Sequence, residues 1–202
     1  MMTIDQREKQ TRLQVRMDEL RAEIAFAQNG EKPWPYRACR ESEGVGCCEK
    51  HGKYRTHILV WDDRQGGAVS KISRCPECLV DEMDVTHRTL VAMKADVLIE
   101  NAGVACRFRD CEFENYQEIN SDAARNLAAC RRYAESWEDV LANGPSLVLT
   151  GSCGTGKNHL AVAMAKHIIR NHLASVEITD VMRLTRAVKN CWRNDSEKTT
   201  DE

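Results

Sequence analysis

A glycine-rich stretch in the second half of the chain has the residue types and spacing of a phosphate-binding loop. From Ser146 to Ala165, in SLVLTGSCGTGKNHLAVAMA, a short apolar run leads into glycines and then into a predicted helix that starts near a lysine. Glycines permit the positive φ angles of a tight turn, whose backbone N–H groups can surround an anion at a helix N-terminus. Lys157 adds a positive charge for the β- and γ-phosphates of a nucleotide. The stretch predicts nucleotide binding; the alternative is a glycine-rich turn with a surface lysine.

The predicted nucleotide-binding residues form one continuous segment. They are Gly151, Ser152, Cys153, Gly154, Thr155, Gly156, Lys157, Asn158 and His159. Asn158 stands where most such loops have Ser or Thr, so its amide oxygen would serve Mg²⁺ as a neutral ligand or through water. Upstream, Phe113 and Tyr116 are candidates for an adenine pocket, because the flat face of a purine stacks on aromatic rings. The alternative is that Phe113 anchors a loop to the core.

Cysteine and histidine residues in the first half of the chain have the spacing of metal ligands. Cys48 and His51 form a C-x2-H pair, and Cys75 and Cys78 form a C-x2-C pair further along the chain. Each pair can hold one side of a tetrahedral ion, and thiolate and imidazole ligands suit Zn²⁺. Because all four positions are filled by protein, the site would be structural rather than catalytic.

Between the two pairs lie two predicted strands, 57–62 and 68–73, whose hairpin would bring the pairs together. The resulting prediction is a structural zinc ribbon. Cys47 is an alternate for Cys48, and Cys39 is a weaker one. A β-hairpin with unligated thiols is the other interpretation.

Composition limits the class of protein. Apolar residues make up 42% and charged residues 30% of the 202-residue chain, as in globular proteins. A net charge of −2 argues against a uniformly basic nucleic-acid binder. No stretch approaches the about 20 apolar residues of a membrane span. We therefore predict a cytoplasmic protein without membrane contact, whose ten cysteines are reduced and in part metal ligands.

The first predicted helix covers residues 3–28 and carries a narrow apolar seam at spacings of three and four. The seam consists of Leu13, Met17, Leu20, Ile24 and Ala27. Such a seam suits packing on one partner helix, in the same protein or in another. Both alternatives remain open at this point.

Helices and strands alternate in the second half of the chain. The predicted elements are a helix over 79–101, irregular chain over 104–120, a helix over 122–142 capped by Ser121, a strand over 146–150, a helix over 156–172, a strand over 176–179 and a helix from Asp180 to about Arg193. This order implies a parallel sheet with crossover helices.

The last predicted helix combines basic and aromatic residues. Arg183, Arg186, Lys189 and Arg193 form a basic stripe, and Trp192 lies on an apolar face with Leu184 and Val188. Such a stripe can follow a phosphate backbone while Trp192 stacks on a base. A solvated charged face is the alternative.

The predicted fold class is α/β, with an N-terminal helix and a zinc-ribbon-like hairpin module before the first half of a P-loop parallel-sheet domain. The predicted domains are an N-terminal helix over 1–30 that is a candidate for partner binding, a zinc module over 36–80, a linker helix over 81–102 and a P-loop nucleotide-binding domain over 103–202, which the family resemblance below implies is a partial ATPase domain.

From about Gly103 to Arg193 the sequence resembles the DnaC/IstB group of AAA+ ATPases, and DnaC-type helicase loaders in particular. The likeness rests on RFRDCEFENY (107–116), CRRYAESW (130–137), GTGKNHLA (154–161) and VEITDVMRLTRAVKNCWRN (176–194). It implies ATP and Mg²⁺ as cofactors and delivery of the replicative DNA helicase onto single-stranded DNA. It also implies helicase contact by the N-terminal helix and self-association through the ATPase domains. The zinc pattern resembles phage and prophage versions.

One departure concerns hydrolysis. No apolar strand ending in Asp-Asp or Asp-Glu follows Lys157, although such a strand end would hold Mg²⁺ and position water. We therefore expect a fragment or a natural truncation that hydrolyses ATP hardly at all, and we assign no catalytic residue. The alternative functions are a non-hydrolysing zinc-ribbon adaptor of the replication machinery and an IstB-like transposition helper.

Overall fold

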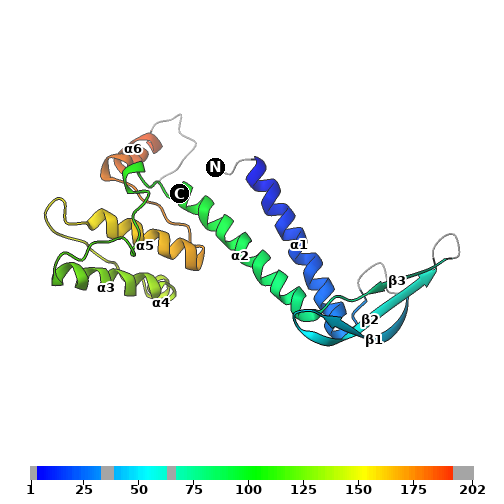
Figure 1. The fold of residues 1–202 in the computed structure, drawn as a ribbon. Helices are drawn as coiled ribbons and strands as arrows, with labels where there is room; N and C mark the ends of the chain where they lie inside the picture. Colours follow the sequence, from blue (N-terminus) through cyan, green and yellow to red (C-terminus); the bar gives the residue numbers. More distant parts are fainter. Residues whose placement is uncertain (1–3, 33–38, 63–66, 193–202) are drawn as a thin grey trace. The chain divides into compact units, whose positions relative to one another are not determined.

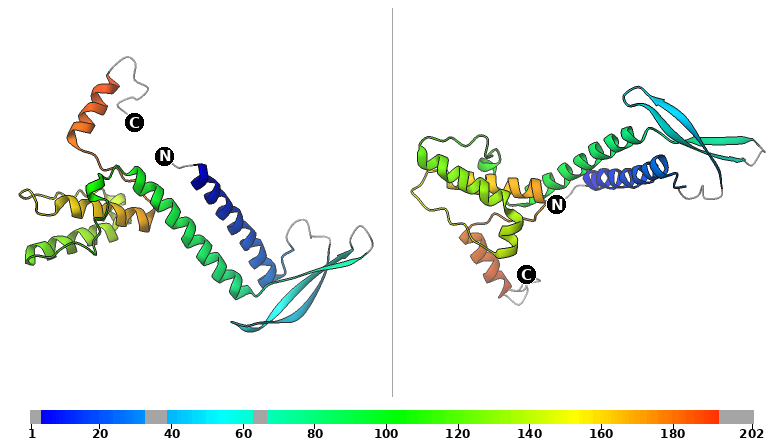
Figure 2. Two further views of the ribbon diagram at one scale, coloured as in Figure 1. Left: turned by 45° about the horizontal axis from the view of Figure 1, so that its top comes forward. Right: turned by 90° about the horizontal axis from the view of Figure 1, so that it is seen from below.

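The computed structural model describes residues 4–32, 39–62 and 67–192 (Figures 1 and 2). The chain divides into two compact units, Met2–Met93 and Lys94–Glu202. The elements of the first unit are α1 (Ile4–Asn29), β1 (Arg40–Cys48), β2 (Gly52–Asp62), β3 (Ala68–Ile72) and most of α2 (Pro76–Asn101). Those of the second are the end of α2, the 3-10 helix η2 (Cys106–Phe108), α3 (Ser121–Glu135), α4 (Trp137–Asn143), α5 (Lys157–His172) and α6 (Val181–Cys191).

The sheet of the first unit is antiparallel, with the strand order β1-β2-β3. The predicted hairpin is confirmed as β2 and β3, which pair with Ile58 opposite Ile72. The sequence analysis missed β1, whose residues RESEGVGCC contain two glycines and four charged or hydroxyl side chains. Such residues have weak intrinsic β-propensity, so the strand depends on its pairing with β2.

The apolar seam of α1 packs within the same protein. Leu20 and Ala27 form a buried cluster with Leu79 of α2, and Ile24 and Met83 pack against it. An ion pair from Arg16 Nη2 to Glu82 Oε1, 2.7 Å long, links the two helices beside this cluster. Of the two alternatives, packing on its own chain is the one observed.

The core of the second unit lies between α3 and α5, which run side by side (Figure 1). The buried residues of this core are Phe113, Leu127, Cys130, Ala134, Leu160, Ala163 and Ile168. The predicted helix over 156–172 is confirmed as α5. Because its buried face packs into this core, α5 fixes the position of its own N-terminus, where the glycine-rich loop joins the helix.

The predicted helix over 122–142 differs from the structure in two places. Asn120, rather than Ser121, is the N-cap: its φ of −160° is extended, and its Oδ1 accepts the N–H of Ala123 at 2.8 Å. Asn and Ser cap about equally well, so the sequence did not separate the two. The helix is also interrupted at Ser136, whose hydroxyl donates to the carbonyl of Arg132 and competes with the helical pattern.

The predicted parallel sheet is not present in the part of the chain that the structure describes. Residues 146–150 and 176–179 form no ladder, because no neighbouring strand pairs with either segment. Instead, the N–H of Ile178 donates to the carbonyl of Ala102, at 2.7 Å. Gly103 permits this approach, since a Cβ there would lie 2.7 Å from the carbonyl oxygen of Ile178. Apolarity without a pairing partner is therefore not enough to make a strand.

Among the described helices, none combines the length and the apolar composition that crossing a membrane requires.

Candidate functional site

The first pair of candidate metal ligands lies at the turn between β1 and β2. Cys48 is the last residue of β1 and pairs with Gly52, the first residue of β2. The positive φ of Gly52, 75°, closes this tight turn. His51 lies inside the turn, so the strand pairing itself brings its ring next to the Cys48 sulfur.

The second pair lies at the start of α2 rather than at a second hairpin turn. Cys75 precedes the helix, Pro76 begins it, and Cys78 lies in its first turn. Proline suits the first helical position because the amide it lacks would have no partner there. One pair thus lies at a hairpin turn and the other at a helix N-terminus, and the two pairs come together as expected.

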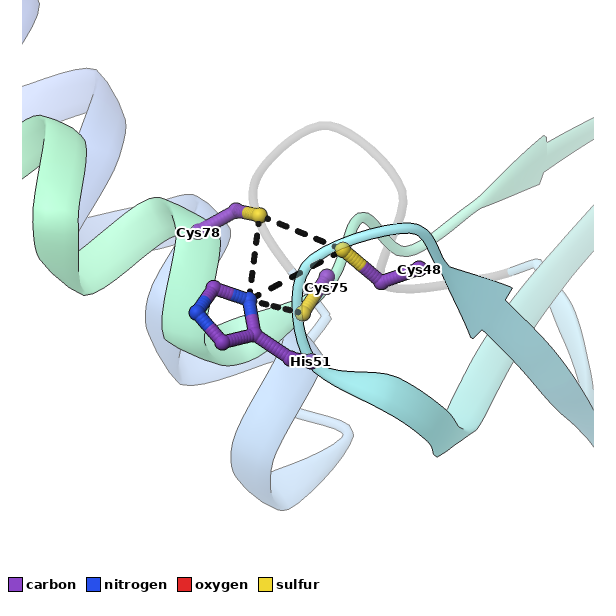
Figure 3. A group of neighbouring side chains, drawn as sticks. All are labelled: Cys48, His51, Cys75 and Cys78. Carbon is purple, nitrogen blue, oxygen red and sulfur yellow. Dashed lines mark hydrogen bonds between the residues drawn. The ribbon is translucent and has the colours of Figure 1, made fainter.

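The four ligand atoms point toward a common centre (Figure 3). His51 Nδ1 lies 3.7 Å from Cys48 Sγ, 3.5 Å from Cys75 Sγ and 3.3 Å from Cys78 Sγ. The sulfurs of Cys48 and Cys78 are 3.5 Å apart, and all four ligand atoms lie within 4.8 Å of one another. Tetrahedral coordination at about 2.0–2.3 Å per bond places ligand atoms about 3.5–3.8 Å apart, so the residues fit a tetrahedral metal.

The surroundings of the cluster favour a thiolate at Cys48. Hydrogen bonds from the backbone N–H groups of His51 and Lys50 lower the pKa of Cys48 to about 6. The hydrogen bond between Cys78 and Cys48 raises the pKa of Cys78 to about 11, because a second negative sulfur beside the first is unfavourable. A divalent cation would remove this repulsion and hold both sulfurs as thiolates.

The outer nitrogen of His51 faces carboxylates. Its Nε2 lies 3.8 Å from Glu77 Oε2 and 3.8 Å from Asp81 Oδ2, both on α2. A carboxylate on this side favours a proton on Nε2, which leaves the Nδ1 lone pair for a metal.

The two alternate cysteines lie outside the cluster. Cys47 is exposed and precedes Cys48 on β1, so its side chain projects to the opposite face of the strand. Neither Cys47 nor Cys39 belongs to the group of four.

The glycine-rich loop lies at the N-terminus of α5. Gly151, Gly154 and Gly156 have φ angles of 141°, 81° and 80°, which only glycine adopts without strain. The Lys157 ammonium donates to the carbonyls of Gly151 and Ser152 at 3.0 and 2.7 Å, and to Thr155 Oγ1 at 3.3 Å. The lysine is thus folded over its own loop, where a phosphate group would compete for its three donors.

An open cleft of about 790 Å³ adjoins the loop. Of the predicted nucleotide-binding segment, all residues line this cleft except Asn158. The opposite wall comes from the start of α3 and the chain before it, and of this wall the sequence analysis predicted only Tyr116. The wall residues are Asn115, Tyr116, Gln117, Ile119, Asn120, Asp122, Ala123 and Asn126.

The two adenine-pocket candidates are separated. Tyr116 lines the cleft, and its ring lies so close to Gly156 that a Cβ there would be 2.8 Å from the tyrosine Cε2. Phe113 is 4% exposed and belongs to the core, with its ring edge against His167 at a centroid distance of 5.6 Å. Phe113 is therefore not in the cleft; burial of its apolar ring fixes the segment on which Tyr116 stands.

A charged cluster that joins residues 109–112 to α5 was not predicted. Glu112 accepts a hydrogen bond from Lys166 Nζ at 2.6 Å and a bidentate pair from Arg170 at 2.8 and 2.9 Å. Burial alone would raise the pKa of Glu112, but the hydrogen bonds from Arg170 and Lys166 outweigh it and lower that pKa.

The basic residues of the last helix are exposed. Arg183, Arg186 and Lys189 all project from α6, while Arg193 lies outside the described residues. The expected apolar face is not buried either: Leu184, Val188 and Trp192 are 56%, 36% and 72% exposed. The Asp180 cap is confirmed, since its side chain accepts the N–H of Arg183.

Comparison with known proteins gives the family. A family model described as IstB-like ATP binding protein matches residues 78–200, more than half of the chain. The chain belongs to the IstB-like ATP-binding protein family. Within this family it is similar to DnaC proteins, as the GTGKNHLA loop indicated. No solved structure matches the chain.

The relatives are named replicative helicase loader DnaC. The protein from Buchnera aphidicola subsp. Schizaphis graminum is 33% identical over 144 residues, which cover 71% of this chain and 52% of that protein. The Escherichia coli K12 protein is 32% identical over 137 residues, which cover 68% and 49%. The chain thus spans about half the length of these relatives. The uncharacterized E. coli K12 protein YdaV is 26% identical over 97 residues, 47% of this chain and 38% of YdaV.

Proposed function

We propose that the chain binds ATP in the cleft beside residues 151–159 and takes part in delivering the replicative DNA helicase onto single-stranded DNA in the cytoplasm. The observation that carries this proposal is a glycine-rich loop, closed by Lys157, at the mouth of an open cleft in an IstB-like chain. The relatives' name, replicative helicase loader, supports the choice of partner.

In this proposal the loop holds the phosphates and Tyr116 lies beside the base. Lys157 leaves its own carbonyls for the β- and γ-phosphates, and backbone N–H groups at the start of α5 complete the anion site. Asn158, exposed beside Lys157, is the candidate for reaching Mg²⁺ through its amide oxygen or a water. We assign no residue to ATP cleavage.

We further propose that Cys48, His51, Cys75 and Cys78 hold one Zn²⁺. The metal would fasten the β1–β2 turn to the start of α2 and so stabilise a small sheet with little core of its own. With four protein ligands the ion has no open position for a substrate.

We assign the contacts with the helicase and with DNA to two other parts of the chain. Residues 1–30 are the proposed helicase-binding element, and α6 is the proposed DNA-binding element. On α6, Arg183, Arg186 and Lys189 would contact phosphates while the exposed ring of Trp192 stacks on a base. Self-association through the ATPase domains is part of the same proposal.

A second candidate is a transposition helper, which the IstB-like description of the family model favours. Size-exclusion chromatography of the chain with the replicative helicase of its source organism, with and without ATP, separates the two. We expect a co-eluting complex. If no complex forms under either condition, the helicase role is wrong, and binding to a transposase on DNA becomes the function to test.

A further inference from the structure

A buried lysine ties α5 to the chain that precedes the cleft wall. The Lys166 side chain is only 5% exposed, and its ammonium donates to the carbonyls of Arg109 and Cys111 and to Glu112 Oε1. An ammonium has three donors, and all three are used here. Since a buried charge without such partners is strongly unfavourable, residues 109–112 are held in one position against α5.

Glu112 contacts α5 through both its side chain and its backbone carbonyl. Its carboxylate binds Lys166 and Arg170, as described above. Its backbone carbonyl oxygen accepts a hydrogen bond from His159 Nε2, at 2.8 Å. His159 lies two residues after Lys157 on α5, and its ring lines the cleft. Glu112, which does not line the cleft, therefore orients a ring that does.

His159 in turn holds Tyr116. The two rings meet edge to face with centroids 5.3 Å apart, and Tyr116 also lies against Gly156. Tyr116 and His159 both line the cleft, whereas Glu112, Lys166 and Arg170 do not. The wall beside the loop therefore depends on contacts that lie behind it.

We propose that Glu112, clamped by Lys166 and Arg170, is a positioning residue for nucleobase binding in this cleft. Its carboxylate fixes the segment before Tyr116, and its carbonyl fixes the His159 ring against which Tyr116 rests. The inference rests on the proposed ATP binding, and it adds that these residues act on the base of the nucleotide rather than on its phosphates. Because the loop and Lys157 act on the phosphates, the clamp affects the base and nucleoside and leaves the polyphosphate unaffected.

The test compares two ligands on the full chain, ATP and inorganic tripolyphosphate, by calorimetric titration. Glu112→Gln removes the charge and turns one acceptor into a donor that faces Lys166 and Arg170. We expect the Kd for ATP to rise at least about tenfold, equivalent to about 1.4 kcal/mol, while the Kd for tripolyphosphate changes by less than about twofold. Glu114→Gln is the matched control: Glu114 is exposed, its ion pair is with Arg131 at 3.7 Å, and its effect on Arg170 is weaker than that of Glu112, so it should change neither Kd.

A double-mutant cycle separates positioning from general stability. Tyr116→Ala removes the wall itself, so adding Glu112→Gln to it should weaken ATP binding by much less than the same change in the wild type. Arg170→Gln, which removes only the exposed bidentate partner, is the second variant if Glu112→Gln does not fold. It should raise the Kd for ATP about threefold and leave tripolyphosphate binding unchanged.

Three results would overturn the proposal. The first is an unchanged Kd for ATP in a folded Glu112 or Arg170 variant. The second is an equal loss of affinity for ATP and for tripolyphosphate. The third is that the effects of Glu112→Gln and Tyr116→Ala on the Kd for ATP are additive. In each case Lys157-dependent ATP binding by the wild type would still stand, so the failure is distinct from a failure of the proposed function. A wild type that binds no ATP overturns both.

Discussion

The metal-ligand cluster and the nucleotide cleft are organised in different ways. In the cluster, the ligands stand at the end of a paired strand, in the turn that follows it and at the start of a helix, and their ligand atoms lie within 4.8 Å of one another. In the cleft, the loop is closed by its own lysine, and the Tyr116 side of the opposite wall is supported by side-chain contacts behind it. The cluster is thus built by the backbone, whereas the cleft depends on replaceable side-chain contacts. Substitutions should therefore act on folding in the first region and on affinity in the second.

The largest expected effect is loss of the metal. Cys75→Ser should reduce the bound zinc from about one ion per chain to almost none, with unfolding of the β1–β3 sheet, because structural zinc contributes folding energy directly. Elemental analysis and circular dichroism on purified protein measure both. Cys47→Ser is the matched control: Cys47 is exposed on the opposite face and should keep full metal content. Equal metal loss in both variants would contradict the assigned ligand set.

A pair of glycine variants tests how the cleft depends on Tyr116. Gly154 and Gly156 have nearly equal φ angles, but a Cβ meets nothing at Gly154 and the Tyr116 ring at Gly156. Both Gly→Ala changes cost about 1–2 kcal/mol of backbone strain. Gly156→Ala should cost more stability than Gly154→Ala and should weaken ATP binding more, as measured by thermal unfolding and ATP titration. Indistinguishable variants would mean that the tyrosine contact is unimportant.

Stability in acid should distinguish Glu112 from its neighbours. The pKa of Glu112 is lowered in the folded state, so its contribution to stability is present above the ordinary glutamate pKa of about 4.3 and is lost as pH falls through the folded value. The difference in Tm between wild type and Glu112→Gln should therefore be constant near neutral pH and shrink below about pH 4.3. A difference that stays constant down to pH 3 would show that the charge of Glu112 does not contribute.

The smallest expected effect concerns the outer side of His51. Glu77→Gln should weaken zinc binding by roughly tenfold or less, since partners of this kind orient a histidine ligand and Glu77 is largely exposed. Competition with a chromophoric chelator measures it. Glu49→Gln, a neighbouring exposed glutamate outside the cluster, should leave the affinity unchanged.

The sequence predicted both candidate sites because their residues are close together in the chain or paired by fixed spacing. The C-x2-H and C-x2-C pairs converge as expected, and the glycines have the positive φ angles that a phosphate loop requires. Helices α1 and α5 follow from their apolar periodicity. Local patterns of this kind are set by short-range geometry, which a single sequence records.

Long-range contacts were harder to predict. Lys166 lies on the buried face of α5 between Val162 and Ile169, and a lysine at that position signals a buried partner without identifying it. Glu112 is 54 residues away and has no local signature. The predicted strands at 146–150 and 176–179 were wrong for a related reason, since an apolar run becomes a strand only beside a pairing neighbour. In the same way, β1 forms from a weak sequence because β2 pairs with it.

The central claim, that this IstB-like chain binds ATP through its loop, is tested most directly by titrating a fluorescent ATP analogue into wild type, Lys157→Ala and Lys189→Ala. Lys189 is exposed on α6 and does not line the cleft, so it controls for loss of one positive charge. We predict saturable binding by wild type and Lys189→Ala, and a Kd at least about tenfold higher for Lys157→Ala. Equal binding by all three proteins, or none by any, would contradict the claim.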